Sequence, residues 1–190
     1  MAGNLATQAG LILRADSGHL KCARPASCAT GTLAIVTERP FVPADFVVPL
    51  ELDGPGFRLV PLEPEHNSAD LAAWSSSMEH IRETPGFGGR PWPHDMTASE
   101  NLVDVEQHAV DFAARTGFTY TVLPPDRPEG DEVIGCVYVY PPQPGDPGDA
   151  AVRSWVRADH AELDSILYAA VRDWLARDWP FHEVEYAARP

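Results

Sequence analysis

The sequence predicts one α/β domain in which a central sheet is flanked by helices, and three observations lead to this fold class. Segments with strand and helix character alternate from residue 57 to the C-terminal end. A nearly continuous apolar run at residues 133–140 is typical of a strand buried on both faces in the middle of a sheet. Two longer segments, 97–117 and 159–175, repeat apolar residues at the spacing of an amphipathic helix. The length of 190 residues fits one such domain.

Residues 1–40 differ from the rest because they are rich in Gly, Ser, Thr, Ala and Pro and show no sustained period. We expect a poorly ordered N-terminal tail over this range, followed by the domain at residues 41–190. A natural start near Val36 is an alternative hypothesis for the beginning of the protein. Cys22 and Cys28 lie in the tail near a histidine, but three candidates without a fourth ligand or a Cys-x-x-Cys pair do not predict a zinc site.

The domain is expected to begin with a strand and a short helix. Residues 57–62 alternate in the manner of a strand before a polar stretch. Either Asn67 or Ser68 can cap a helix over residues 68–77, whose apolar stripe includes Trp74.

The middle of the chain combines a loop, a long helix and a strand. Gly and Pro interrupt residues 84–95, which predicts a long loop that either borders a binding site or is an irregular connector. Thr97 and Glu100 form a capping box that starts the long helix, and Gly117 is expected to close it. Residues 118–123 then form a short strand ahead of the central one.

The C-terminal third is expected to contain a loop, a strand, a helix and a final strand. A proline- and glycine-rich loop at residues 141–148 leads into a strand at 151–157. The clearest helical period in the chain follows over residues 163–175, with Asp159 as its N-cap. A final short strand is expected at residues 183–187.

Composition excludes several classes of function. The net charge is -14 and Lys21 is the only lysine, which argues against a nucleic-acid interface and favours neutral or cationic small partners. The three cysteines cannot form a closed disulfide framework, which fits a reducing compartment. No apolar stretch reaches 18 residues and no secretion signal is evident, so we expect a cytoplasmic protein that does not enter a membrane. Nucleophile-elbow, zinc-protease, Walker and dinucleotide-binding motifs are also missing from the sequence.

The order of strands and helices over roughly residues 57–188 resembles the GNAT fold of acetyl-CoA-dependent N-acetyltransferases. Residues 57–62 resemble the first strand of that family, residues 133–137 resemble its apolar Ile-Gly third strand, and residues 151–157 with the following helix resemble its fourth strand and cofactor helix. The resemblance implies a mixed, mostly antiparallel central sheet flanked by helices. It also implies transfer of an acetyl group from acetyl-CoA to an amine of a small molecule or protein.

The resemblance further implies where acetyl-CoA binds. The backbone of Trp155, Val156 and Arg157 is expected to hold the pantetheine chain, and His160 and Ser165 are expected near the pyrophosphate at the helix N-terminus. Helix N-termini attract phosphate because their amides are unpaired and carry the positive end of the helix dipole.

The family's phosphate loop follows the pattern Q/R-x-x-G-x-G/A, and the chain departs from it. Residues 157–164 contain no glycine, and the first turn holds the carboxylates of Asp159, Glu162 and Asp164. One interpretation is a plain capping box on a structural helix. The other is a variant site that still binds acyl-CoA.

Acetylation of an amine needs a base for the ammonium proton and an acid for the leaving thiolate. Glu79 and His80 follow the first helix, where the family's substrate loop lies, and Tyr138 is on the central strand. An exposed charged turn and a core aromatic are the structural alternatives for these three residues. Trp74 and Trp92 are candidates for the wall of a pocket for an apolar or aromatic amine.

Two hypotheses for function remain open at this point. The chain is an N-acetyltransferase, or it is a non-catalytic protein of the same fold that binds a ligand or partner. The closing elements of the family have no counterpart after Ala188, which leaves a sheet edge that pairing into a homodimer would cover.

Overall fold

The computed structural model describes residues 40–125 and 132–190. Most of the N-terminal tail therefore lies outside the described residues, as do Cys22 and Cys28, and the tail stays a prediction. The described elements are β1 (Leu52–Gly54), β2 (Phe57–Pro61), the 3-10 helix η1 (Pro64–His66), α1 (Asn67–Ser75), α2 (Met78–Glu83), α3 (Ala98–Ala114), β3 (Phe118–Leu123), β4 (Gly135–Tyr140), β5 (Ala150–Val156), the 3-10 helix η2 (Ala158–Leu163), α4 (Asp164–Asp178) and β6 (Val184–Tyr186). Across the described residues, no helix has the length and apolar run needed to cross a membrane.

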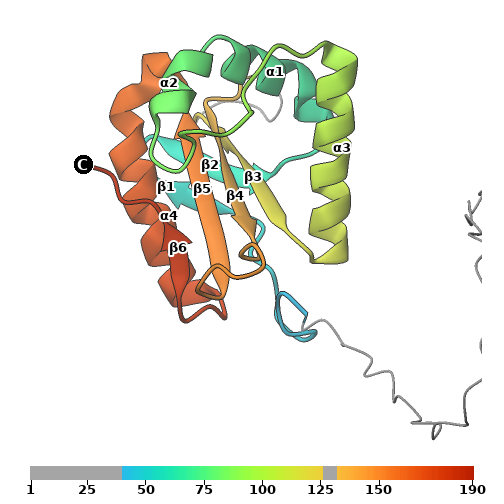
Figure 1. The fold of residues 1–190 in the computed structure, drawn as a ribbon, viewed down its shortest axis with the longest axis vertical. Helices are drawn as coiled ribbons and strands as arrows, with labels where there is room; N and C mark the ends of the chain where they lie inside the picture. The colour runs from blue at the N-terminus through green and yellow to red at the C-terminus, as the bar shows by residue number, and fades with distance from the viewer. Residues whose placement is uncertain (1–39, 126–131) are drawn as a thin grey trace, which may run out of the picture. The chain divides into compact units, whose positions relative to one another are not determined.

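The six strands form one mixed sheet in the order β1-β2-β3-β4-β5-β6 (Figure 1). Neighbouring strands are antiparallel except β5 and β6, which run parallel. This last pairing is short, because it joins only Ala150–Val152 to Val184–Tyr186. Within the described part of the chain, no strand pairs with the outer edge of β5 from Arg153 to Val156. The predicted mixed, mostly antiparallel sheet flanked by helices is confirmed.

Side chains alternate between the two faces of the sheet, and the two faces differ. The face packed against α4, here called the α4 face, carries an apolar core in which Tyr120 and Trp174 have ring centroids 5.3 Å apart. The opposite face, here called the pocket face, packs against α1 and α3. It holds a second cluster with Trp74, Val105 and Trp155. In Figure 1, α4 and α3 lie at opposite sides of the strands.

Helix α3 begins as the sequence predicts and ends differently. The Thr97 hydroxyl accepts from the Glu100 amide, and the Glu100 carboxylate accepts from the Thr97 amide at 2.8 Å. Its C-cap is Arg115 in the left-handed region at φ 62°, so Gly117 does not close the helix. Arg115 is held there because its guanidinium donates to the carbonyls of Pro43 and Phe46. Gly117 is needed instead for close approach, since a Cβ there would lie 2.1 Å from the Tyr140 ring.

Near the beginning of the domain, the structure adds two short elements. A tight turn with Gly56 at φ 84° joins β1 to β2, so the predicted first strand is the second one. The first helix begins at Asn67 directly after η1, with His66 as its N-cap rather than Asn67 or Ser68. Helix α2 follows α1 after two residues. Glu79 and His80, for which an exposed charged turn was one interpretation, therefore lie in a helix.

The C-terminal helix also begins later than the sequence predicts. Asp159 does not cap it, because His160 leaves helical geometry at φ -125°, ψ 24° and α4 begins only at Asp164. The Asp159 carboxylate instead accepts from Arg157 Nε at 2.9 Å. The predicted apolar face is otherwise present, with Leu167 and Trp174 buried, although Ile166 is 39% exposed.

Candidate functional site

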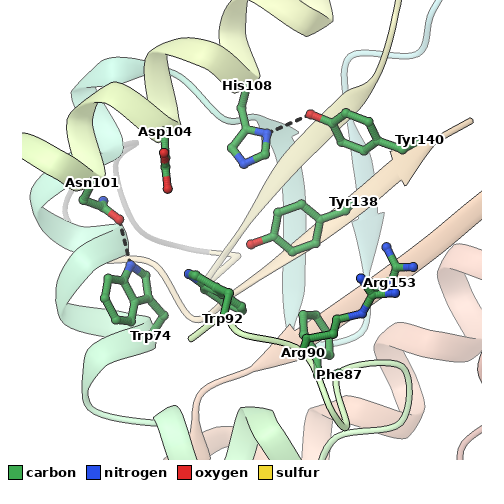
Figure 2. A pocket seen from close by; sticks show the side chains of 10 residues that line it. All are labelled: Trp74, Phe87, Arg90, Trp92, Asn101, Asp104, His108, Tyr138, Tyr140 and Arg153. Atoms are coloured by element: carbon green, nitrogen blue, oxygen red, sulfur yellow. Dashed lines mark hydrogen bonds between the residues drawn. The ribbon is translucent and has the colours of Figure 1, made fainter. Parts of the chain in front are cut away.

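A cavity of about 270 Å³ opens on the pocket face between α1, α3, β4, β5 and the loop at residues 84–95 (Figure 2). The strand register explains why polar groups gather here. Thr119 lies opposite Tyr138, and Tyr138 lies opposite Arg153, so these three side chains share one face of the sheet. The lining residues are Trp74, Phe87, Arg90, Trp92, Asn101, Asp104, His108, Tyr138, Tyr140 and Arg153.

Aromatic rings form the wall of the cavity, with Trp92 at their centre. Its ring centroid lies 5.9 Å from that of Trp74, 5.8 Å from Phe87 and 6.5 Å from Tyr138. Trp74 is fixed because its Nε1 donates to Asn101 Oδ1 at 2.9 Å. Both predicted wall residues, Trp74 and Trp92, therefore line the same cavity.

His108 of α3 is held by hydrogen bonds that determine its tautomer. The Tyr140 hydroxyl donates to Asp111 Oδ2 at 3.0 Å, and the Thr119 hydroxyl donates to the Tyr140 oxygen at 3.4 Å. With both hydroxyl protons used, His108 Nδ1 donates its proton to these oxygens, at 2.8 Å from Tyr140 and 3.0 Å from Thr119. The lone pair is then on Nε2, the ring nitrogen that Figure 2 shows directed into the cavity.

Burial sets the protonation of these groups. It lowers the pKa of His108, while the negative charges of Asp111 and Asp104 oppose this shift, so the ring is neutral at pH 7. Burial raises the pKa of Tyr138 well above its ordinary value, and raises that of Tyr140 as well. The cavity therefore presents one neutral base and two protonated phenols.

Behind the cavity wall, a buried polar network joins α1 to α3 and β4. Asn101 Nδ2 donates to Asp70 Oδ2 at 3.0 Å, and the Cys136 thiol contacts Asp70 Oδ1 at 3.9 Å. Burial raises the pKa of Asp70 to about 6, although the hydrogen bonds from Asn101 and Cys136 oppose the shift. Burial, with the charge of Asp70, also raises the pKa of Cys136, so this thiol is a packed side chain and not a reactive one.

The structure separates the sequence-predicted catalytic residues. Tyr138 lines the aromatic cavity, whereas Glu79 and His80 of α2 line a second cavity of about 320 Å³ with Ser77 and Ala158. Glu79 is exposed, and His80 Nε2 is buried with no hydrogen-bond partner among the residues that the structure describes.

The residues predicted to bind the cofactor follow β5 into η2, and most of their polar groups are already bonded. Trp155 and Val156 are buried, and Trp155 Nε1 donates to the Tyr138 hydroxyl at 3.1 Å. Arg157 forms an ion pair with Glu132 at 3.1 Å in addition to its bond to Asp159.

At the N-terminal end of η2, the polar groups are likewise in use. His160 Nδ1 contacts Asp159 Oδ1 at 2.9 Å, and the Ala158 amide donates to the Ser77 hydroxyl at 3.0 Å. Ser165 is exposed in the first turn of α4. These bonds would compete with a phosphate for the same groups.

Arg189 occupies the outer edge of β5 beyond the β6 pairing. Its Nη2 donates to the Ser154 carbonyl at 2.8 Å and its Nε donates to Asp164 Oδ2 at 2.7 Å, with only 2% of its side chain exposed. The guanidinium also lies over the rings of Tyr168 and Tyr186. A pantetheine chain that binds the Ser154 carbonyl must displace this side chain. Among the residues that the structure describes, no three His, Cys, Asp or Glu side chains are placed to hold a metal ion.

Sequence reasoning missed four charged or titratable residues of the cavity, which come from the 84–95 loop, α3 and β5: Arg90, Asp104, His108 and Arg153. One signal was available: Asp104 and His108 are four residues apart and therefore share a helix face. The strand residues Thr119 and Tyr140 identify that face only once the sheet register is known.

Comparison with known proteins supports the fold. No family model matches the sequence, and no curated protein sequence matches it. Among solved structures, the ribosomal-protein-S5-alanine acetyltransferase from Vibrio fischeri is similar at a TM-score of 0.52 and 12% identity, with 72% of each chain covered. A ribosomal L7/L12 α-N-protein acetyltransferase, RimL, in complex with coenzyme A is similar at a TM-score of 0.49 and 12% identity, with 68% of this chain and 67% of that one covered. The first of these matches, together with the strand order of the sheet, shows that the chain has the fold of the GNAT acetyltransferases.

Proposed function

We propose that this protein is an N-acetyltransferase that moves an acetyl group from acetyl-CoA to an amine bound in the aromatic cavity. The observation that carries the proposal is His108, a neutral base with its Nε2 directed into a cavity that Arg153 of β5 also lines. The similarity in fold to acetyltransferases supports it.

His108 is suited to the proton transfer that the reaction needs. An ammonium has no lone pair, so its proton must leave before nitrogen can attack the thioester carbonyl. His108 Nε2 accepts that proton while Nδ1 keeps its hydrogen bond to Tyr140. The negative charge of Asp111, which accepts from the Tyr140 hydroxyl, stabilises the resulting cation. As the carbon–nitrogen bond forms and the carbon–sulfur bond breaks, the departing thiolate needs a proton. The protonated hydroxyl of Tyr138, which Figure 2 shows directed toward Trp92, donates this proton. The acetylated nitrogen then releases its second proton, which restores the Tyr138 hydroxyl.

The surroundings of His108 favour a cationic substrate. Asp104 lies one turn before His108 on α3 and lines the same cavity, so its carboxylate attracts an ammonium. Trp74 and Trp92 line the same cavity, and cation–π attraction to an aromatic ring is worth about 0.5–2 kcal/mol in proteins.

The test is an acetyl-transfer assay with acetyl-CoA and a panel of amines, with the acetylated product detected by mass. The expected result is turnover that falls by about 10²-fold or more in His108→Gln, because general-base catalysis is worth roughly that much. His182→Gln is the matched control, since His182 is exposed and lies outside the cavity. Equal rates in the two variants would exclude His108 as the base.

The second candidate function is ligand binding without catalysis. The observation that favours it is Arg189, which holds the Ser154 carbonyl that a pantetheine chain would use. Calorimetry with acetyl-CoA distinguishes the two candidate functions. Arg189→Ala is measured beside the native protein, because this variant frees the Ser154 carbonyl. Binding to the native protein supports the transferase. Binding only to the variant, or to neither, supports the non-catalytic function.

The remaining expectations about the setting of the protein stay proposals. We propose a cytoplasmic protein that pairs into a homodimer through the sheet edge at β6, the short C-terminal strand. Light scattering at micromolar concentration tests this, because a monomer mass would exclude the dimer.

A further inference from the structure

We propose that the ligand of the aromatic cavity is a small amine that also carries an anionic group, and that Arg90 and Arg153 bind this group at the end of the cavity away from Asp104. The assignment of the amine end rests on the proposed function. The assignment of the anion end rests on the two arginines alone.

The two arginines form a pair built around Gly86. Arg90 Nε donates to the Gly86 carbonyl at 3.0 Å. A Cβ added at Gly86 would lie 3.7 Å from Arg153 Cγ, so the Arg153 stem packs against the same residue. Figure 2 shows both guanidinium groups on one side of the cavity, with Asp104 and Asn101 on the other. The structure therefore gathers two positive charges at one end of a small cavity.

Neither guanidinium has an ion-pair partner within residues 40–125 and 132–190. The chain has 28 acidic and 14 basic residues, so a shortage of acids does not explain why these two arginines lack an ion pair. Burial and the charge of Arg90 lower the pKa of Arg153, while Glu185 and Asp146 attract it from a distance without forming an ion pair. Two like charges held together cost free energy, and an anion between them relieves the repulsion.

The remaining walls specify the rest of the ligand. Asp104 and His108 favour an amine, and the rings of Trp92 and Tyr138 lie between the two charged ends. A cavity of about 270 Å³ is at the lower end of the size range of small-molecule sites. The ligand class is therefore a compact molecule with an apolar or aromatic body, an amine at one end and a carboxylate or similar anion at the other.

Three matched probes test this without acetyl-CoA: para-aminomethylbenzoate, para-methylbenzylamine and para-methylbenzoate. The first has both charged ends, and each of the others lacks one. Binding is followed by calorimetry and by fluorescence, because Trp74 and Trp92 line the cavity. We expect para-aminomethylbenzoate to bind about tenfold or more tightly than either single-ended probe, since one charge-assisted hydrogen bond has roughly that value.

Variants of the two arginines test which side chains cause the preference for the double-ended probe. Arg153→Gln and Arg90→Gln are each expected to remove most of the preference for para-aminomethylbenzoate over para-methylbenzylamine. Binding of para-methylbenzylamine itself should not weaken, because each substitution removes a positive charge that repels its ammonium. Arg172→Gln is the control, because Arg172 is exposed on α4 and pairs with Asp173. Circular dichroism and thermal melts show whether each variant is folded.

Several outcomes would overturn the proposal. They are equal affinity for the double-ended and amine-only probes, an unchanged preference in both arginine variants, or no binding of any probe at millimolar concentration. The proposed function fails separately, if para-aminomethylbenzoate binds as expected but is not acetylated in the presence of acetyl-CoA.

Discussion

Two adjacent rows of side chains that run across β3, β4 and β5 differ in chemistry. On the α4 face, Phe118, Val139 and Val152 lie opposite one another. On the pocket face, the neighbouring row is Thr119, Tyr138 and Arg153. Because successive residues of a strand point to opposite sides, one stretch of chain supplies both an apolar core and a polar cavity wall.

The helices that cover the two faces match this difference. Helix α4 places Leu167, Val171 and Trp174 on the α4 face, where these side chains are fully buried. Helix α3 places Asp104 and His108 over the pocket face, where they line a cavity. We propose that the α4 face mainly stabilises the fold and that the pocket face, whose cavity leaves side chains such as Trp92 half-buried, carries the function.

The largest expected effect is on the α4 face. Trp174→Ala should lower the free energy of unfolding by about 3–5 kcal/mol, because Trp174 is 1% exposed and packs against Tyr120 and Trp179. Trp92→Ala, on the pocket face, should cost clearly less, since Trp92 is only half-buried, yet it should weaken probe binding. Urea denaturation measures both. Similar losses in the two variants would remove the distinction between the faces.

A second effect concerns the buried carboxyl group beneath the cavity. The pKa of Asp70 is about 6 in the folded protein and near 3.8 when unfolded, so the native state holds the proton between these values. Stability should therefore fall as pH rises from about 4 to 6, by about 3 kcal/mol at most. Asp70→Asn cannot ionise and keeps an acceptor for Asn101, so its stability relative to the native protein should rise over that window. Parallel stability curves from pH 4 to 7 would contradict this.

A third effect is the pH dependence of acetyl transfer. The neutral form of His108 is the base, and burial lowers its pKa below 6.5. The ratio of kcat/KM in the native protein to that in His108→Gln should rise with pH and level off, with a midpoint below 6.5. This ratio cancels the ionisation of the amine itself. A midpoint above 7 would show that another group acts as the base.

The smallest effect separates stability from binding within α3. Thr97→Ala removes the capping box and should cost about 1 kcal/mol, without changing the affinity of the cavity for para-aminomethylbenzoate. Ser99→Ala, two residues along the same turn, should leave the stability nearly unchanged. Thermal melts and calorimetry measure the two quantities. A large loss of affinity in Thr97→Ala would show that the cavity depends on the end of α3.

Local patterns in the sequence predicted much of the fold. The strand at Phe118–Leu123 and the capping box of α3 are where the sequence places them, because alternation and capping depend on residues that are near in the chain. The N-cap at Asp159 and the closing Gly117 were wrong. At the first, the Asp159 carboxylate accepts from Arg157, which also pairs with Glu132. At the second, α3 ends at Arg115, which donates to the distant carbonyls of Pro43 and Phe46.

The candidate site was predicted only in part. The sequence alone determined the amphipathic helices, the central strand and two of the aromatic wall residues, since each follows from a short-range period or composition. The tertiary structure decided which polar groups meet. His108 and Tyr140 are 32 residues apart, and they form a hydrogen bond only because the register of β3 and β4 and the docking of α3 bring them to one face. Such contacts depend on the packing of whole elements, which no local pattern encodes.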